Sequence, residues 1–344
     1  VKSFIARTWP WPIKLLDMTL LWCVLPIFIL SIFTKREDKR EVNTNRGDLS
    51  VISIGLAVLF ILRFAVLNID RAQVNILIML LLIFFVYYEA RGKQVLSGVY
   101  IAVATAFKLT PAIFIIYLVL KKRYKALASS IVAFAALMVL PAFKIGFKRN
   151  ADLLVGWVGA LRRTFPAEYL QHKNQSLMAA ISRLFSKNSD MAFFKLDGDH
   201  LTWTIAIVYA VMLALLLYFT REKRGVTRGR SLLYDLSLYF VSMTLLSPVG
   251  SKTTFVYLFF PLALLIRESL DRHLKDKVLN AGLLLYVFLT YINSGDIIGD
   301  FSVVLHKYSL MTFCLLIVFA LTIYVKRTVG SVKFQARKYS EGTA

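Results

Sequence analysis

A lysine and a proline interrupt one of the most apolar stretches of this chain. The run from residue 95 to 120 reads VLSGVYIAVATAF, then KLT, then PAIFIIYLVL, with Lys108 and Pro111 near its middle. A charged side chain within a membrane helix is costly and usually functional, and proline breaks helices because it lacks a backbone donor. The pattern predicts two short helices that meet at a cation, as in sites that hold an ion, a phosphate or a proton.

A second group of polar residues follows another apolar run, where residues 68–75 read NIDRAQVN. The amides of Gln73 and Asn75 can exchange hydrogen bonds with sugar hydroxyls, and Asp70 is a candidate general base. A simpler interpretation is a solvated helix start, with Asp70 near the positive end of the helix dipole. The spacing alone leaves both interpretations open.

The longest segment between apolar runs, residues 143–199, supplies further candidates. Arg162 and Arg163 follow the apolar VGWVGAL, which suits a helix on the membrane interface, and guanidinium groups there can bind a substrate phosphate or lipid head groups. Asn174 and Gln175 precede a second amphipathic turn, and Glu168 is a second candidate base.

Another cation, Lys252, lies in the turn SPVGSKTT that follows a later apolar run. Together with Lys108, Arg162, Arg163 and Arg183 it predicts a cationic cavity at membrane depth. A lipid phosphate head group is the ligand that such a cavity would suit.

The rest of the sequence shows which elements must hold these residues in place. The chain is 58% hydrophobic, and its apolar runs are long enough to cross a bilayer. They lie near 15–33, 49–67, 73–90, 95–120, 124–142, 201–220, 231–248, 252–267, 278–292 and 309–325. The predicted fold is an all-α polytopic membrane protein of one domain, residues 1–344, with a large outer-face loop at 143–199.

The net charge of +22 is gathered in short segments between the apolar runs, at 35–40, 121–125, 221–230 and 267–277. This is the pattern of cytoplasmic loops, and it excludes a nucleic-acid surface. All of these segments fall on one side only if 95–107 enters the membrane and 111–120 returns. We therefore predict about nine full spans plus a re-entrant pair; the alternative is a single kinked span with Lys108 buried.

Cysteine and histidine usage predicts no metal site and no cofactor. Cys23 and Cys314 lie in apolar runs, and the four histidines are scattered without a ligand-like spacing. In the predicted topology the first run enters from outside, so we expect a further span upstream of the sequence as given.

Four sequence elements resemble glycosyltransferase family 87. They are AQVN at 72–75, SGVYIAVATAFKLTPAIFIIYLVLKKRYKAL at 97–127, NQSLMAAISRL at 174–184 and SPVGSKTTFVYLFFPL at 247–262. The resemblance implies a C-type membrane glycosyltransferase that takes mannose or a pentose from a polyprenyl-phosphate donor. The acceptor would be a glycolipid or glycan on the outer face of the cell membrane, and membrane lipids would surround the enzyme.

The resemblance also implies that Gln73, Asn75, Lys108, Asn174 and Gln175 line the donor or acceptor site. The family's catalytic carboxylate usually lies in the first outer loop, which we expect upstream of this chain. Members often carry histidine after the SP element, where this chain has Thr253 and Thr254. A polymerase or ligase of lipid-linked saccharides, or a transporter or flippase, are the alternatives.

Overall fold

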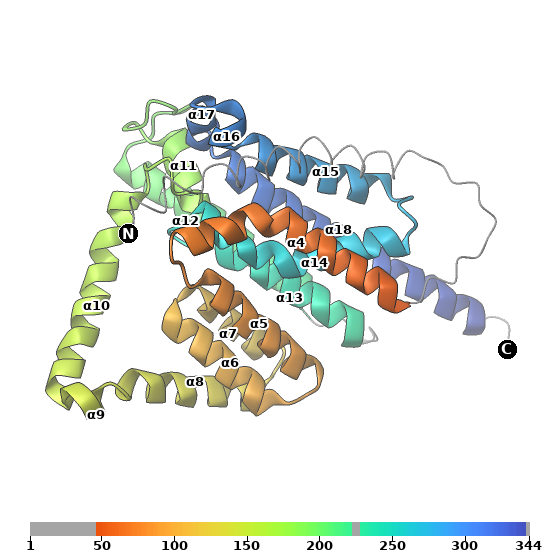
Figure 1. Cartoon of the computed structure of the whole chain (residues 1–344), viewed down its shortest axis with the longest axis horizontal. Helices are drawn as coiled ribbons and strands as arrows, with labels where there is room; N and C mark the ends of the chain where they lie inside the picture. Colours follow the sequence, from red (N-terminus) through yellow and green to blue (C-terminus); the bar gives the residue numbers. More distant parts are fainter. Residues whose placement is uncertain (1–45, 222–227, 342–344) are drawn as a thin grey trace.

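The computed structural model describes residues 46–221 and 228–341, which fold almost entirely into helices (Figure 1). The longer helices are α4 (Arg46–Asp70), α5 (Asn75–Ala90), α6 (Gln94–Phe107), α7 (Ile113–Leu120), α8 (Tyr124–Val139), α10 (Phe147–Glu168), α11 (Leu177–Phe185), α12 (Gly198–Thr220), α13 (Arg228–Leu245), α14 (Phe259–Asp271), α15 (Lys277–Ile292) and α18 (Leu310–Glu341). The shorter ones are η2 (Thr110–Ala112), α9 (Ala142–Ile145), η3 (Lys252–Leu258), α16 (Gly295–Ile298) and α17 (Phe301–Lys307). In the described ranges the extended pairing is one isolated bridge between Ser186 and Leu196.

Within the described ranges, five helical segments are long and apolar enough to cross a membrane. They are Val51–Asp70, Tyr124–Ile145, Gly198–Thr220, Lys252–Asp271 and Leu310–Thr328, and five shorter apolar helices accompany them. The all-α membrane class is therefore confirmed. The number of nine spans stays a prediction, and the run at 15–33 lies outside the described residues.

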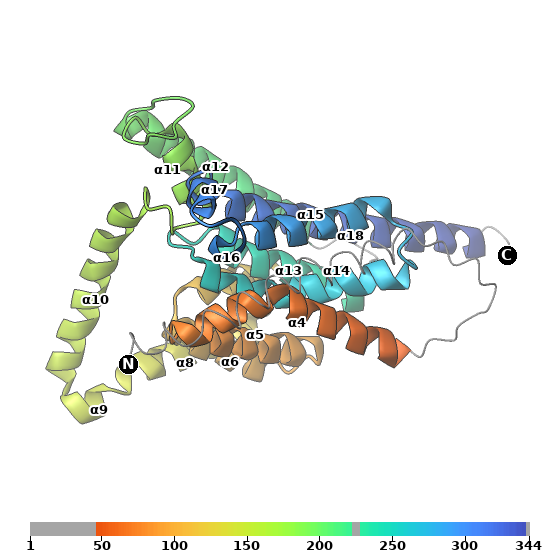
Figure 2. The ribbon, with the colours of Figure 1, turned by 45° about the horizontal axis from the view of Figure 1, so that its top comes forward.

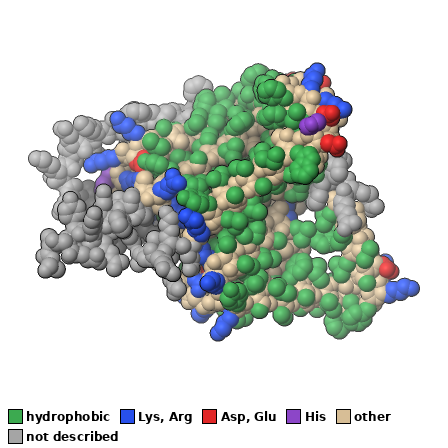
Figure 3. Space-filling view, turned by 180° about the vertical axis from the view of Figure 1, so that it is seen from behind, with side chains coloured by type: hydrophobic (Ala, Val, Ile, Leu, Met, Phe, Trp, Pro, Cys, Tyr) green, Lys and Arg blue, Asp and Glu red, His purple; other side chains and the backbone are tan. Residues whose placement is uncertain are grey.

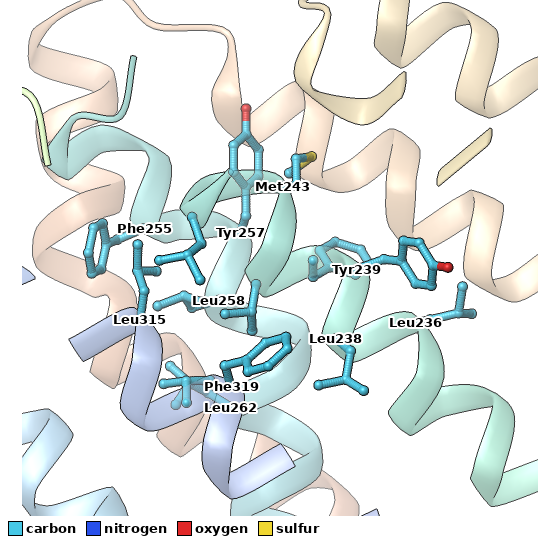
Figure 4. Close-up of a cluster of buried hydrophobic side chains, with 14 of the residues drawn as sticks. Leu236, Leu238, Tyr239, Met243, Phe255, Tyr257, Leu258, Leu262, Leu315 and Phe319 are labelled. Atoms are coloured by element: carbon cyan, nitrogen blue, oxygen red, sulfur yellow. The ribbon is translucent and has the colours of Figure 1, made fainter. Parts of the chain in front are cut away.

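Helix α13 forms the centre of the bundle, because its side chains are buried around the whole circumference of the helix. Every residue from 234 to 245 is buried, as expected for a helix surrounded by others. Figure 4 shows side chains of α13, η3, α14 and α18 packed together, among them Leu238, Leu258 and Leu315.

The outer surface of the bundle is also apolar. Along α12, Trp203, Ile207 and Val211 are four residues apart and are 70%, 60% and 52% exposed. Figure 3 shows hydrophobic side chains over much of one face, with Lys and Arg mostly near its edges. A continuous apolar surface of this kind is suited to contact with lipid tails.

The helix break at Lys108 is confirmed. Helix α6 ends at Phe107, Lys108 is extended, and Pro111 lies in the 3-10 turn η2 that leads into α7. At one end the Lys108 ammonium contacts Asn75 at the start of α5; at the other, Tyr117 donates to Glu89 near the end of α5. Helix α7 thus brings the chain back along α5. Its position relative to a bilayer stays a prediction.

Three basic connections meet at this returning end of the bundle. The carboxylate of Asp235 pairs with Lys121 at 2.8 Å and also with Lys326, and Arg272 donates to Thr328 Oγ1 at 2.7 Å. The segments 121–125 and 267–277 and the C-terminal helix therefore gather at one end, which we call the basic end.

The opposite end carries the turn between α4 and α5, the Lys108 break, α11, α16 and α17, and we call it the polar end (Figure 1). Asp70 is the last residue of α4, so the interpretation of Asp70 at a positive helix start is wrong. Figure 2 shows α9 and α10 standing apart from the bundle beside the polar end.

Candidate functional site

The turn at residues 247–254 lies at the centre of the polar end and holds the Asn174–Ser176 element. The Asn174 amide oxygen accepts from the Gly250 N–H at 2.9 Å, and its NH2 donates to the Pro248 carbonyl at 3.1 Å. The Gln175 N–H donates to the Gly250 carbonyl at 2.6 Å. A Cβ at Gly250 would lie 3.1 Å from the Ser176 nitrogen, so glycine permits this close approach.

Arg183 connects this element to the segment around residues 307–309. Its guanidinium donates to the carbonyls of Gln171 and Asn174 at 2.7 Å each, to the carbonyl of Lys307 at 3.2 Å and to the Ser309 hydroxyl at 2.7 Å. Burial lowers its pKa to about 10, so the group stays charged at neutral pH. Its donors serve the protein's own oxygens, and the prediction that Arg183 belongs to a phosphate-binding cavity is wrong.

Lys108 joins the site through Asn75, which is completely buried. The Asn75 amide oxygen accepts from the Lys108 ammonium at 3.0 Å and from the Tyr257 hydroxyl at 2.7 Å. The Asn75 NH2 donates to Asn68 at 2.9 Å, and Asn68 donates in turn to the Thr253 carbonyl at 2.7 Å. Tyr257 keeps its ring among the core residues while its hydroxyl points out of them (Figure 4).

Two further cations converge beside the same turn. The Lys252 ammonium donates to the Asn293 carbonyl at 2.9 Å, and the buried Arg63 guanidinium donates to the carbonyls of Thr290 at 3.1 Å and Asn293 at 3.5 Å. Burial, followed by the positive charges of Lys252 and Arg63, lowers the pKa of His306 to about 3. His306 is therefore neutral in an environment that favours anions.

The structure brings half of the predicted site residues into one connected network around residues 247–254. These residues are Asn75, Lys108, Asn174, Gln175 and Lys252. Asp70 and Gln73 lie at the same end, but both are exposed in the turn between α4 and α5.

The remaining three predicted site residues, Arg162, Arg163 and Glu168, lie in the last two turns of α10, and their side chains fall outside the described part of the chain. In the described ranges, no group of three or more His, Cys, Asp or Glu side chains could hold a metal ion.

Several residues of the network are not evident from the sequence reasoning. Arg63 carried a usable signal, because it is a cation inside the apolar run 49–67, the criterion that identified Lys108. Asn68 is seven residues before Asn75 and therefore lies close to the same turn. Tyr257, Asn293 and His306 carried no signal, since their positions depend on how distant helices pack.

Comparisons with known proteins show which family the sequence belongs to. The model of glycosyltransferase family 87 matches residues 7–248. The chain is 33% identical over 144 residues to the polyprenol-phosphate-mannose-dependent alpha-(1-2)-phosphatidylinositol pentamannoside mannosyltransferase of Mycobacterium tuberculosis (strain CDC 1551 / Oshkosh). The matched part is 40% of this chain and 31% of that relative, so the chain spans less than a third of the relative's length. No solved structure gives a significant match. Because the family model covers more than half of its length, this membrane protein belongs to glycosyltransferase family 87.

Proposed function

We propose that the protein transfers a sugar, mannose or a pentose, from a polyprenyl-phosphate donor to a glycolipid or glycan acceptor. The family is one of glycosyltransferases, and the mycobacterial relative is named for a polyprenol-phosphate-mannose donor. The reaction would take place at the polar end. Because the basic end has the charge of cytoplasmic loops, the polar end would face the outside of the cell membrane.

The single observation that carries this proposal is the placement of two lysines at residues 247–254, one within this turn and one connected to it. Lys108 reaches the turn through Asn75 and Asn68, and Lys252 lies within it. A polyprenyl-phosphate sugar releases an anionic phosphate when the sugar leaves. Fixed cations that meet this developing charge would lower the barrier, and they act most strongly where water is excluded.

The chemistry needs no metal or cofactor for its basic steps. An acceptor hydroxyl attacks the anomeric carbon, the bond from that carbon to the phosphate oxygen breaks, and a carboxylate takes the hydroxyl proton. Asp70 and Glu168 are our candidates for that base among the residues of this chain. The Asp70 carboxylate is exposed at the end of α4, five residues before Asn75.

Helix α10 would support the reaction from the membrane surface. Val155 and Trp157 on this helix are 73% and 42% exposed, which suits a helix that lies on lipid. Arg162 and Arg163 follow on the same helix and would meet the phosphate of the donor or of neighbouring lipids.

The test is sugar transfer by the purified full-length protein in liposomes that contain a glycolipid acceptor. Radiolabelled polyprenyl-phosphate mannose and the matching pentose donor are supplied separately, with a nucleotide sugar as control. We expect label to move to the glycolipid from one of the lipid donors and not from the nucleotide sugar. Movement of the lipid-linked sugar across the bilayer without transfer would contradict the proposal and indicate a flippase.

A further inference from the structure

Several buried side chains in the described part of the polar end have polar atoms without a hydrogen-bond partner, and three of them lie around the contacts that Lys252 and Gln175 make. The atoms of these three are the amide oxygen of Gln175, the Nε2 atom of His306, and both amide atoms of Asn293. The three residues are 1%, 9% and 0% exposed. Buried polar groups without partners are rare in native proteins because each one costs free energy, so their occurrence together calls for a functional reason.

The three residues belong to one neighbourhood. The Gln175 NH2 group donates to the His306 carbonyl at 2.9 Å. Lys252 donates to the Asn293 carbonyl at 2.9 Å, and the charge of Lys252 acts on the His306 ring. Asn293 directly follows α15, and His306 lies in the short helix α17; the short helix α16 is between them in the chain.

The free atoms are mostly acceptors, which defines the ligand they suit. The His306 ring is neutral, because burial and neighbouring positive charges lower its pKa to about 3, so one of its two nitrogens has a lone pair, and Nε2 is the one without a partner. The free Gln175 oxygen is also an acceptor, while Asn293 offers one acceptor and one NH2 donor. Acceptors repel a phosphate but receive hydrogen bonds from hydroxyl groups.

We propose that Gln175, Asn293 and His306 bind the hydroxyl groups of the sugar on the lipid-linked donor, next to the phosphate held by Lys252. The inference rests on the proposed function and adds to it the residues that distinguish a sugar-bearing lipid from a bare one. It also explains why the side chains lack partners in the protein alone, since their partners would come with the substrate.

The experiment compares two lipid probes that differ only in the sugar. Binding of a polyprenyl-phosphate sugar and of the same polyprenyl phosphate without sugar is measured for the full-length protein in detergent, beside thermal unfolding. The variants are Asn293→Leu, which keeps the side-chain size, and Lys252→Met. The matched control is Asn188→Leu, an exposed residue of the outer loop.

We expect Asn293→Leu to weaken binding of the sugar-bearing lipid about five- to tenfold, from the loss of one to two hydrogen bonds. Its binding of bare polyprenyl phosphate should equal that of the wild type, and its melting temperature should be equal or higher. Lys252→Met should weaken both probes, and Asn188→Leu neither. A second variant, His306→Phe, should repeat the selective loss.

Two results would overturn the inference in distinguishable ways. If the wild type transfers sugar but Asn293→Leu binds both lipids as the wild type does, or loses both together with stability, the sugar subsite is wrong and the proposed function stands. If the wild type neither transfers the sugar nor prefers the sugar-bearing lipid, the proposed function fails and this inference fails with it.

Discussion

Replacing Lys108 with methionine is the most informative single change, because the structure separates its effect on activity from its effect on folding. Methionine keeps an unbranched side chain of similar length and removes the ammonium group with its charge and hydrogen-bond donors. The Asn75 oxygen that loses the lysine still accepts from Tyr257 at 2.7 Å. No buried acceptor is therefore left without a partner, and we expect the free energy of unfolding to fall by only about 1 kcal/mol.

The expected loss of activity is much larger. If Lys108 stabilises the departing phosphate, its removal should cost about 3–4 kcal/mol of transition-state stabilisation, as for the loss of one preorganised donor. That corresponds to a decrease of about 10²–10³-fold in kcat. The assay is initial-rate sugar transfer from the lipid donor in liposomes, with thermal unfolding of each purified variant measured in parallel.

Lys93→Met is the matched control for this variant. Lys93 is exposed beside α6 at the basic end, and its replacement should leave transfer within about twofold of the wild type. The reasoning would be refuted if Lys108→Met transferred sugar at close to the wild-type rate. It would also be refuted if the variant lost activity only in proportion to the fraction that unfolds.

Three further predictions concern the scaffold. Asp235→Asn should destabilise the protein by about 3 kcal/mol in thermal unfolding, because two lysine partners are then left without their buried carboxylate; an unchanged midpoint would contradict this. A Cβ at Gly98 would lie 2.1 Å from the Ala126 carbonyl oxygen, so Gly98→Ala should cost about 1–3 kcal/mol by forcing α6 and α8 apart. Gly156→Ala, which meets nothing within 4 Å, should cost nothing measurable. The lowered pKa of His306 means that below about pH 6.5 the unfolded chain binds a proton that the folded protein does not, so stability should fall from pH 6.5 towards pH 4. His306→Gln should remove that part of the decline in melting temperature. Identical pH profiles of the melting temperature for the wild type and this variant would refute the prediction.

The sequence was sufficient for features that depend on local chemistry. A lysine followed by proline three residues later predicts the break between α6 and α7, because no continuous helix accommodates both at low cost. The lysines and arginines between apolar runs predict a basic end of the bundle. In the structure, the ion pairs of Asp235 with Lys121 and Lys326 stabilise this end. Asn75, Lys108 and Lys252 were identifiable because polar side chains within or beside apolar membrane segments cost free energy and are usually functional.

The remaining features depend on contacts between distant segments. The sequence predicts Arg183 as a phosphate ligand. In the structure its guanidinium donates to the carbonyls of residues 171, 174 and 307, and the spacing of these residues in the sequence does not indicate such contacts. Asn293 reaches the site only because α15 ends beside α4 and the turn at 247–254. Whether the five shorter apolar helices cross the membrane likewise depends on their tilt and on the helices that pack against them. Amino-acid composition does not determine either.

Sugar transfer in liposomes from a radiolabelled polyprenyl-phosphate donor, added to the leaflet that faces the polar end, tests the central claim most directly. Orientation is read from proteolysis of the basic segment at 267–277, which should be cut only from the opposite side. The account predicts glycolipid labelling when donor and polar end share a leaflet and a loss of labelling in Lys108→Met. Labelling that requires the donor on the side of the basic loops, or that occurs only with a nucleotide sugar, would contradict it.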